Sequence, residues 1–159
     1  MSAILASARA KEYGGPVGTT GLSDSRIRVI RGLFALFATT SFALGGWMML
    51  DPVAAWRAMG IEVDSVPLVP VLYGGAIMGE GVMAALGFVW PVRYLVFLQY
   101  MIAYKTFACV AASVLLLRVD DPPMAGWLVV ASWAFPAVAS AAVFPWTRWK
   151  NVEEWYGAK

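Results

Sequence analysis

Four long apolar stretches, separated by short polar or proline-containing segments, dominate the pattern along this chain. A transmembrane helix needs about 20 predominantly apolar residues. The stretches that reach this length are residues 29–50, 68–89, 94–117 and 125–146. Backbone groups in lipid must be satisfied internally, and the alternation typical of barrel strands is not visible, so the pattern predicts helices. We therefore expect an all-α, polytopic membrane protein built as a four-transmembrane-helix bundle.

Aspartate and proline mark the joints between these spans. Asp51 followed by Pro52 is a favourable helix start, because aspartate caps free N–H groups and proline suits the first helical position. The segment that follows gathers its apolar residues on one side and stops at Gly60, so we expect a short interfacial helix between spans one and two. The dipeptide Trp90-Pro91 predicts a tight turn between spans two and three.

Two short segments flank the predicted transmembrane domain. Residues 1–25 lack the pattern of a cleaved signal peptide and are interpreted as a cytoplasmic N-terminal tail. Residues 26–146 form the transmembrane domain. Residues 147–159 mix tryptophan with basic residues directly after a span, which favours a cytoplasmic interfacial segment over nucleic-acid binding.

Composition agrees with a membrane protein and narrows the chemistry. Hydrophobic residues make up 60% of the 159 residues and charged residues 14%, against about 45–50% and about 25% in soluble domains. The chain has no histidine and a single cysteine, Cys109. Histidine-ligated metals and haem, and catalytic pairs that contain histidine, are therefore excluded. We predict no catalytic residue and no metal site.

The positive charges predict the orientation, because cytoplasmic loops are enriched in lysine and arginine. Most of them lie on one side of the predicted spans: Arg9, Lys11, Arg26, Arg28, Arg31, Arg93, Arg148, Lys150 and Lys159. The other side has Arg57 and Arg118, together with several acidic residues. We therefore place both termini in the cytoplasm and the chain in a bacterial cytoplasmic (inner) membrane.

Tryptophans support the span boundaries, since amphipathic rings prefer the membrane interface. The predicted interface anchors are Trp47, Trp56, Trp90, Trp127, Trp146 and Trp149. Trp133 lies well inside span four instead. Aromatic packing explains that position, and contact with a pigment or a quinone is the alternative.

Two charged residues, Glu80 and Lys105, lie near the middle of spans two and three. A charge at the bilayer centre costs at least about 2.5–3.5 kcal/mol on insertion scales. The two spans form an antiparallel hairpin, and counting from its turn at about 1.5 Å per residue places both charges at nearly the same depth. The register therefore predicts an ion pair.

Other residues are expected to gather around this pair. Candidate polar neighbours at the same depth are Tyr73, Tyr104, Thr39 and Thr40. Small residues let helices approach closely in lipid, and those near the two charges are Gly75, Gly79, Gly81, Ala108 and Ala112. They predict a tight contact between spans two and three, although Gly75-x-x-x-Gly79 could equally mark a contact between subunits.

The ion pair has a structural and a functional interpretation. A buried pair can lock the register of two helices without adding net stability. The functional alternatives are a proton relay, a quinone head-group site, or a substrate carboxylate held by Lys105.

The second span also resembles a known family. Residues 73–88, with their glycines, Glu80 and a closing Leu86-Gly87, are similar to a helix of the DoxX-like small four-helix membrane proteins. The resemblance covers residues 29–146 and includes the aspartate–proline joint. It implies an accessory membrane subunit, since some such proteins accompany quinone-using oxidoreductases, and it matches Glu80 to the acidic position. Lys105 and the long N-terminal tail depart from the family's pattern.

We expect a non-catalytic structural or accessory subunit of a larger bacterial membrane complex, respiratory or photosynthetic. Its partners would be membrane lipids and other membrane-protein subunits. The alternative is a small transporter, or a quinone- or lipid-interacting protein, that uses the Glu80–Lys105 site. An enzyme acting on lipid or quinone ranks third. No resident cofactor is predicted, and a bound lipid, quinone or carotenoid is left open.

Overall fold

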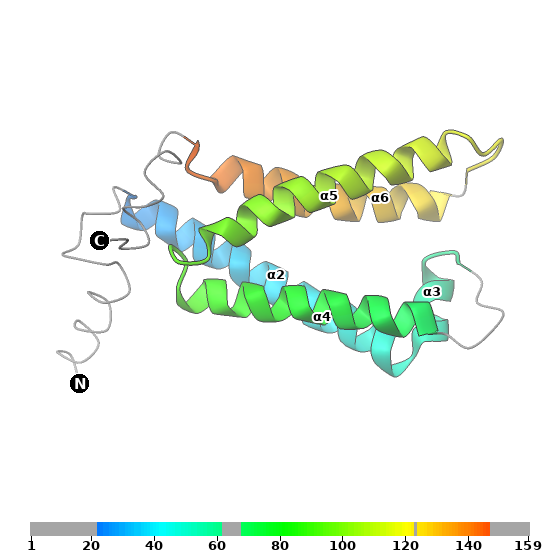
Figure 1. Cartoon of the computed structure of the whole chain (residues 1–159), viewed down its shortest axis with the longest axis horizontal. Coiled ribbons are helices and arrows are strands. Elements are labelled where there is room, and N and C mark those ends of the chain that lie inside the picture. The colour runs from blue at the N-terminus through cyan, green and yellow to red at the C-terminus, as the bar shows by residue number, and fades with distance from the viewer. Residues whose placement is uncertain (1–21, 62–67, 123, 147–159) are drawn as a thin grey trace.

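The computed structural model describes residues 22–61, 68–122 and 124–146 (Figure 1). The long helices are α2 (Asp24–Leu50), α4 (Leu68–Val89), α5 (Leu95–Leu116) and α6 (Met124–Val143), and the short helix α3 (Pro52–Ala58) follows α2. No strand occurs within these described ranges. Each long helix has the length and apolar composition needed to cross a membrane. The all-α, multi-pass prediction is confirmed at this level.

The helix ends follow local capping chemistry. The side chain of Ser23 accepts a hydrogen bond from the Arg26 N–H at 3.3 Å, so α2 begins at Asp24, inside the stretch assigned to the N-terminal tail. α6 ends at Val143 instead of residue 146. Pro145 explains this earlier end, because proline has no N–H and disfavours a helical residue before it.

The aspartate–proline joint behaves as the sequence predicts. Asp51 accepts a hydrogen bond from the Ala54 N–H at 3.1 Å, and Pro52 occupies the first position of α3. Gly60 follows the helix with a φ of 76°, a left-handed conformation that glycine adopts without steric cost. The short helix is confirmed, and its place at the membrane interface stays a prediction.

The long helices are arranged as two pairs. α2 packs along α4, and α5 packs along α6, whereas α4 and α5 make few contacts beyond the turn that joins them (Figure 1). The α2–α4 crossing depends on two glycines. A Cβ on Gly45 would lie 2.8 Å from the Gly74 carbonyl oxygen, and a Cβ on Gly74 would lie 2.8 Å from the Cβ of Met48. Only glycine at both positions permits this approach.

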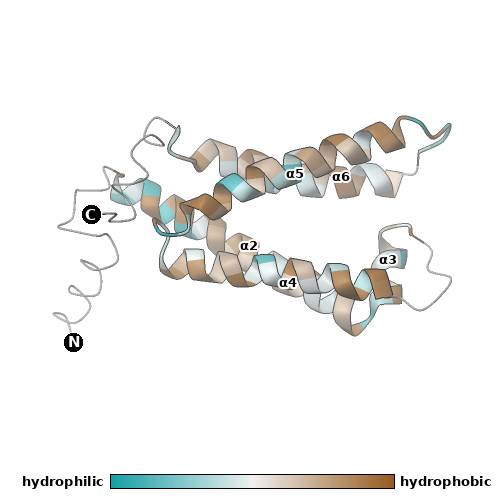
Figure 2. Ribbon diagram, in the orientation of Figure 1, coloured by the Kyte–Doolittle hydropathy of each residue, from teal (hydrophilic) through white to brown (hydrophobic). Residues whose placement is uncertain are grey.

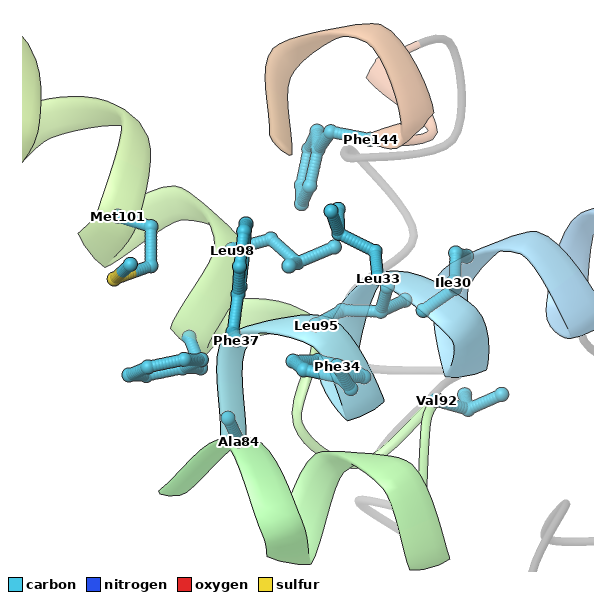
Figure 3. Close-up of a cluster of buried hydrophobic side chains, with 11 residues drawn as sticks. Ile30, Leu33, Phe34, Phe37, Ala84, Val92, Leu95, Leu98, Met101 and Phe144 are labelled. Carbon is cyan, nitrogen blue, oxygen red and sulfur yellow. The ribbon is translucent and has the colours of Figure 1, made fainter. Parts of the chain in front are cut away.

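An apolar core joins the two pairs at the end of the bundle where α2 begins (Figure 3). Phe34 and Phe37 from α2 meet Leu95 and Leu98 from α5, and Phe144, just after α6, covers them. Arg26 adds a polar link at this end, since its guanidinium donates to the carbonyl oxygens of Val143 and Phe144 at 3.3 and 3.1 Å. The core therefore anchors all four long helices at one end only.

Burial shows where the pairs separate. Along α5 the last buried residue is Lys105, and along α6 burial begins only at Ala137. The remaining halves of α5 and α6 expose large apolar side chains, among them Phe107 and Leu128. Hydrophobic colour covers most of the four long helices in Figure 2, as expected where lipid is the solvent.

The glycine crossing yields a stability prediction. Changing Gly45 or Gly74 to alanine places a methyl group against backbone or Cβ atoms and should destabilise the protein by about 1–3 kcal/mol. Thermal unfolding of the purified protein in detergent, followed by tryptophan fluorescence, measures the loss.

Adjacent glycines supply the matched controls. Gly46→Ala and Gly75→Ala add the same methyl group at positions where no atom lies within 4 Å. These two variants should keep the wild-type midpoint. Equal losses for all four variants would show that the crossing does not depend on close backbone approach.

Candidate functional site

The charged residues near the middle of α4 and α5 meet where the helix pairs separate. The Nζ atom of Lys105 lies 3.0 Å from Oε2 of Glu80 and donates a hydrogen bond to its Oε1 at 3.1 Å. The two side chains are 7% and 12% exposed. Because Lys105 is the last buried residue of α5, the ion pair ties α4 to α5 beyond the end of the apolar core.

Aromatic rings surround the ammonium group of Lys105. Its Nζ atom lies 4.8 Å from the centre of the Tyr104 ring and 4.4 Å from the centre of the Trp133 ring. Each cation–π contact contributes about 0.5–2 kcal/mol, with the larger values in desolvated sites. The positive charge of Lys105 is thus stabilised by one carboxylate and two aromatic rings, which explains the position of Trp133 inside span four.

These two rings belong to a longer row of aromatic contacts. The centroid distance is 5.6 Å between Tyr73 and Trp133, and 5.3 Å between Tyr100 and Tyr104. In order, the row contains Trp56, Tyr73, Trp133, Tyr104, Tyr100, Phe97 and Phe34. The row passes from α3 to α2 and crosses both helix pairs beside the ion pair.

A cavity of about 240 Å³ lies against the ion pair, between the four long helices. We call it the central cavity. Its polar lining is Thr40, Ser41, Glu80, Lys105 and Ser132, and its remaining walls are apolar or aromatic. Pro136 also lines it, and the missing N–H of that proline leaves the Ser132 carbonyl without its usual helical donor. The central cavity therefore brings polar groups together between the long helices, among mostly apolar walls.

A second cavity, of about 470 Å³, lies between α4 and α5. We call it the α4–α5 cavity. Glu80 lines both this cavity and the central one. Gly79, Phe97 and Tyr100 are among its other walls. Glu80 thus borders two cavities while its carboxylate contacts Lys105 of α5.

A third cavity, of about 500 Å³, lies between α3 and α6. We call it the outer cavity, after the predicted orientation. It is lined by Leu44, Met48, Trp56, Ala58, Met59, Ile61, Tyr73, Ala125, Leu128, Val129, Ser132 and Trp133. Leu44, Ser132 and Trp133 also line the central cavity, so the two cavities adjoin one another.

Only some of the predicted polar neighbours lie beside the ion pair. Tyr104 covers Lys105 and Thr40 lines the central cavity, but the Thr40 hydroxyl donates within its own helix, to the Leu36 carbonyl at 2.9 Å. Thr39 is exposed and lines none of the cavities described above. Tyr73 lines the outer cavity and is not a hydrogen-bond partner of Glu80.

The expected tight contact between spans two and three is absent from the described part of the chain. No atom lies within 4 Å of a Cβ built on Gly75 or Gly79. Gly81 is close to Phe42 of α2 instead, and Ala108 and Ala112 line a small cavity of about 110 Å³ beside α6. Small residues are common on several faces of these helices, so the sequence alone could not show which face is the contact.

The predicted tryptophan anchors also separate into two groups. Trp47, Trp90 and Trp146 are 44%, 39% and 56% exposed and lie at the ends of long helices. Trp127 is half-buried near the start of α6. Trp56 is half-buried too and lines the outer cavity, a role that sequence reasoning missed. Trp149 lies outside the described residues.

The ion pair leads to a prediction on stability. Lys105→Met removes the ammonium and leaves the Glu80 carboxylate buried without its counter-charge. Breaking a buried pair in this way typically costs about 3–5 kcal/mol, so we expect a clear drop in the thermal midpoint of the purified protein.

A charge-free double variant is the control for this prediction. Glu80→Gln combined with Lys105→Met removes both charges and should recover much of the lost stability, because replacing both partners avoids an isolated charge. If the single variant is as stable as the wild type, the pair does not hold the helices together.

Comparisons with known proteins give no further guidance on this site. No family model, no curated protein and no solved structure matches the chain. The resemblance of residues 29–146 to the DoxX-like proteins therefore stays a prediction, and no role is transferred from it to Glu80.

Proposed function

We propose that this chain is a membrane protein that binds a small amphipathic molecule, of the quinone or lipid class, in the central cavity. The observation that supports this most is the position of Glu80 and Lys105. Both line a cavity, in addition to contacting each other between α4 and α5. A pair that serves only to lock helix register needs no adjoining cavity.

The lining of the central cavity suits an amphipathic ligand. Glu80 and the Ser132 carbonyl are acceptors, and Ser41 and Lys105 carry donors, all in the lining of one cavity. Leu36, Phe37 and Phe135 supply apolar walls, and Leu36 and Phe135 are exposed on the outside of the bundle. A molecule with a polar head and an apolar tail would place its head at the ion pair and its tail toward lipid.

This proposal keeps the chain non-catalytic and places it in a bacterial cytoplasmic membrane. The surplus of lysine and arginine on one side supports cytoplasmic termini. Binding in the membrane requires no nucleophile, metal or nucleotide loop from the chain itself. The bound molecule would be exchanged with the bilayer or with a neighbouring protein.

A second function, that of an accessory subunit in a larger membrane complex, is favoured by a separate observation. Gly75 and Gly79 have open space beside them on α4. Glycines four residues apart on an uncovered helix face can accept another helix at close range. The DoxX-like resemblance points to the same role.

Two adjacent threonines test the ligand-binding proposal. Both threonines are exposed, but only Thr40 lines the central cavity, so Thr40→Phe places a ring at the cavity and Thr39→Phe places the same ring outside it. Each protein is purified in mild detergent, and co-purifying lipophiles are extracted and measured by mass spectrometry. We expect the wild type and Thr39→Phe to retain a quinone or lipid in near-stoichiometric amount and Thr40→Phe to lose at least about nine-tenths of it, a tenfold change that corresponds to about 1.4 kcal/mol.

An exchange of the two charges adds a second arm to this test. The Glu80→Lys, Lys105→Glu protein keeps an ion pair but reverses its polarity within the cavity. If this protein folds and retains the lipophile as the wild type does, the pair has a structural role. If Thr40→Phe also retains the lipophile at the wild-type level, the proposed site is refuted.

The accessory-subunit proposal has its own test. Gly75→Leu and Gly79→Leu place side chains on the open face of α4 and should abolish stoichiometric co-purification of other membrane subunits with a tagged chain. Gly46→Leu, at another helix position with open space, is the matched control. A wild-type chain that purifies as a lone monomer or homo-oligomer would contradict this role.

A further inference from the structure

Two exposed arginines, Arg28 and Arg93, lie at the end of the bundle where α2 begins. Arg28 belongs to the second turn of α2, and Arg93 lies in the turn between α4 and α5. The two segments meet at this end, because Ile30 and Val92 belong to the same apolar core (Figure 3). We call this end of the bundle the core end and the opposite one the far end.

The formal charge of the described residues differs between the two ends. At the core end, four arginines accompany one aspartate, which gives a net charge of +3; they are Arg26, Arg28, Arg31, Arg93 and Asp24. At the far end, two arginines accompany three aspartates, which gives a net charge of −1; they are Arg57, Arg118, Asp51, Asp120 and Asp121. The core end therefore attracts anions, and the far end does not.

The arginines of the core end differ in what they already contact. Arg26 and Arg31 are half-buried and take part in interactions within the chain. Arg28 and Arg93 are exposed, and neither forms an ion pair in the part of the chain that the structure describes. A guanidinium group presents several N–H donors in a plane and matches two oxygens of one phosphate. These two side chains are thus available to an anion from outside the chain.

Aromatic rings beside these arginines indicate the level of the lipid head groups. Trp90 and Tyr94, which flank Arg93 along the chain, stack with their ring centres 6.4 Å apart. Trp146, just after α6, is 56% exposed at the same end. Tryptophan and tyrosine rings prefer the membrane interface, so a charged group next to them lies where lipid phosphates are concentrated. The anion that fits this level is the head group of an anionic phospholipid.

We propose that the core end binds anionic phospholipids, whose phosphates accept hydrogen bonds from Arg28 and Arg93, and that the far end does not select them. This inference goes beyond the proposed function, because it concerns a surface at one end of the bundle and not the cavities. The core end is also where all four long helices are joined. A lipid that binds there stabilises the folded bundle by mass action.

Lipid selection is measured with the full-length protein in nanodiscs that contain equal amounts of phosphatidylglycerol and phosphatidylcholine. The lipids that stay bound are counted by native mass spectrometry. The wild type should be enriched in phosphatidylglycerol. In the double variant Arg28→Gln, Arg93→Gln this enrichment should fall about 5-fold for each arginine removed. The double variant Arg57→Gln, Arg118→Gln removes the same charge from the far end and should keep the wild-type enrichment.

A stability measurement is the second arm of the test. In uncharged detergent, added phosphatidylglycerol should raise the thermal midpoint of the wild type and of the far-end variant, but not that of Arg28→Gln, Arg93→Gln. Raising the salt concentration from about 0.1 to about 1 M should remove most of this effect, because the Debye length falls from about 10 to about 3 Å. Without lipid, the core-end variant should keep the wild-type midpoint, since its two arginines have no ion-pair partner to lose.

A charge-preserving variant covers the case in which the glutamine variant does not fold. Arg28→Lys, Arg93→Lys keeps both charges and should retain most of the enrichment, and with the salt dependence of the wild type it then decides the test. Equal losses in the two glutamine variants would show that total charge, and not the core end, selects the lipid. That result would overturn the inference. A wild type that retains both lipids equally, or that binds an acidic protein at this end in place of phosphatidylglycerol, would overturn it too.

Discussion

The arrangement of this protein depends on the pairing of one carboxylate with one ammonium group in the middle of apolar helices. Neither Glu80 nor Lys105 can be left alone at that depth, because an isolated charge in lipid is costly. Their contact at 3.0 Å holds α4 near α5 although the two helices barely pack against each other. The electrostatic constraint thus takes the place of the side-chain packing that joins α2 to α4.

The ion pair also determines where the bundle can be hollow. On one side of it, phenylalanines and leucines from α2 and α5 fill the interior. On the other side, the helix pairs separate and cavities replace the core. Aromatic rings cover the ammonium group at this boundary, so Lys105 stays compensated without complete enclosure. A charged pair at the edge of a core can therefore remain accessible to a ligand while still being buried enough to form.

Sequence reasoning succeeded where a local rule or a count along the chain was sufficient. Four apolar stretches of membrane length, the Asp51-Pro52 helix start and the shared depth of Glu80 and Lys105 are of this kind. Sequence reasoning did not identify which faces of the helices meet. Gly75 and Gly79 were expected in a tight contact, but Gly45 and Gly74 form one instead. In helices that are apolar on all sides, no polar face marks the outside, so small residues alone cannot indicate the partner.

The two functional proposals concern different sides of the same carboxylate and are compatible. Gly79 lines the α4–α5 cavity beside Glu80, so a partner helix seated on Gly75 and Gly79 would cover that cavity from outside. The central cavity lies on the other side of Glu80, between the two helix pairs. A partner subunit there would leave the central and outer cavities in place and would bring its own residues close to the ion pair. In such a complex, the partner would approach Glu80 from the α4–α5 cavity while a ligand occupied the central cavity on the other side of the ion pair, so the carboxylate would be the one group that borders both.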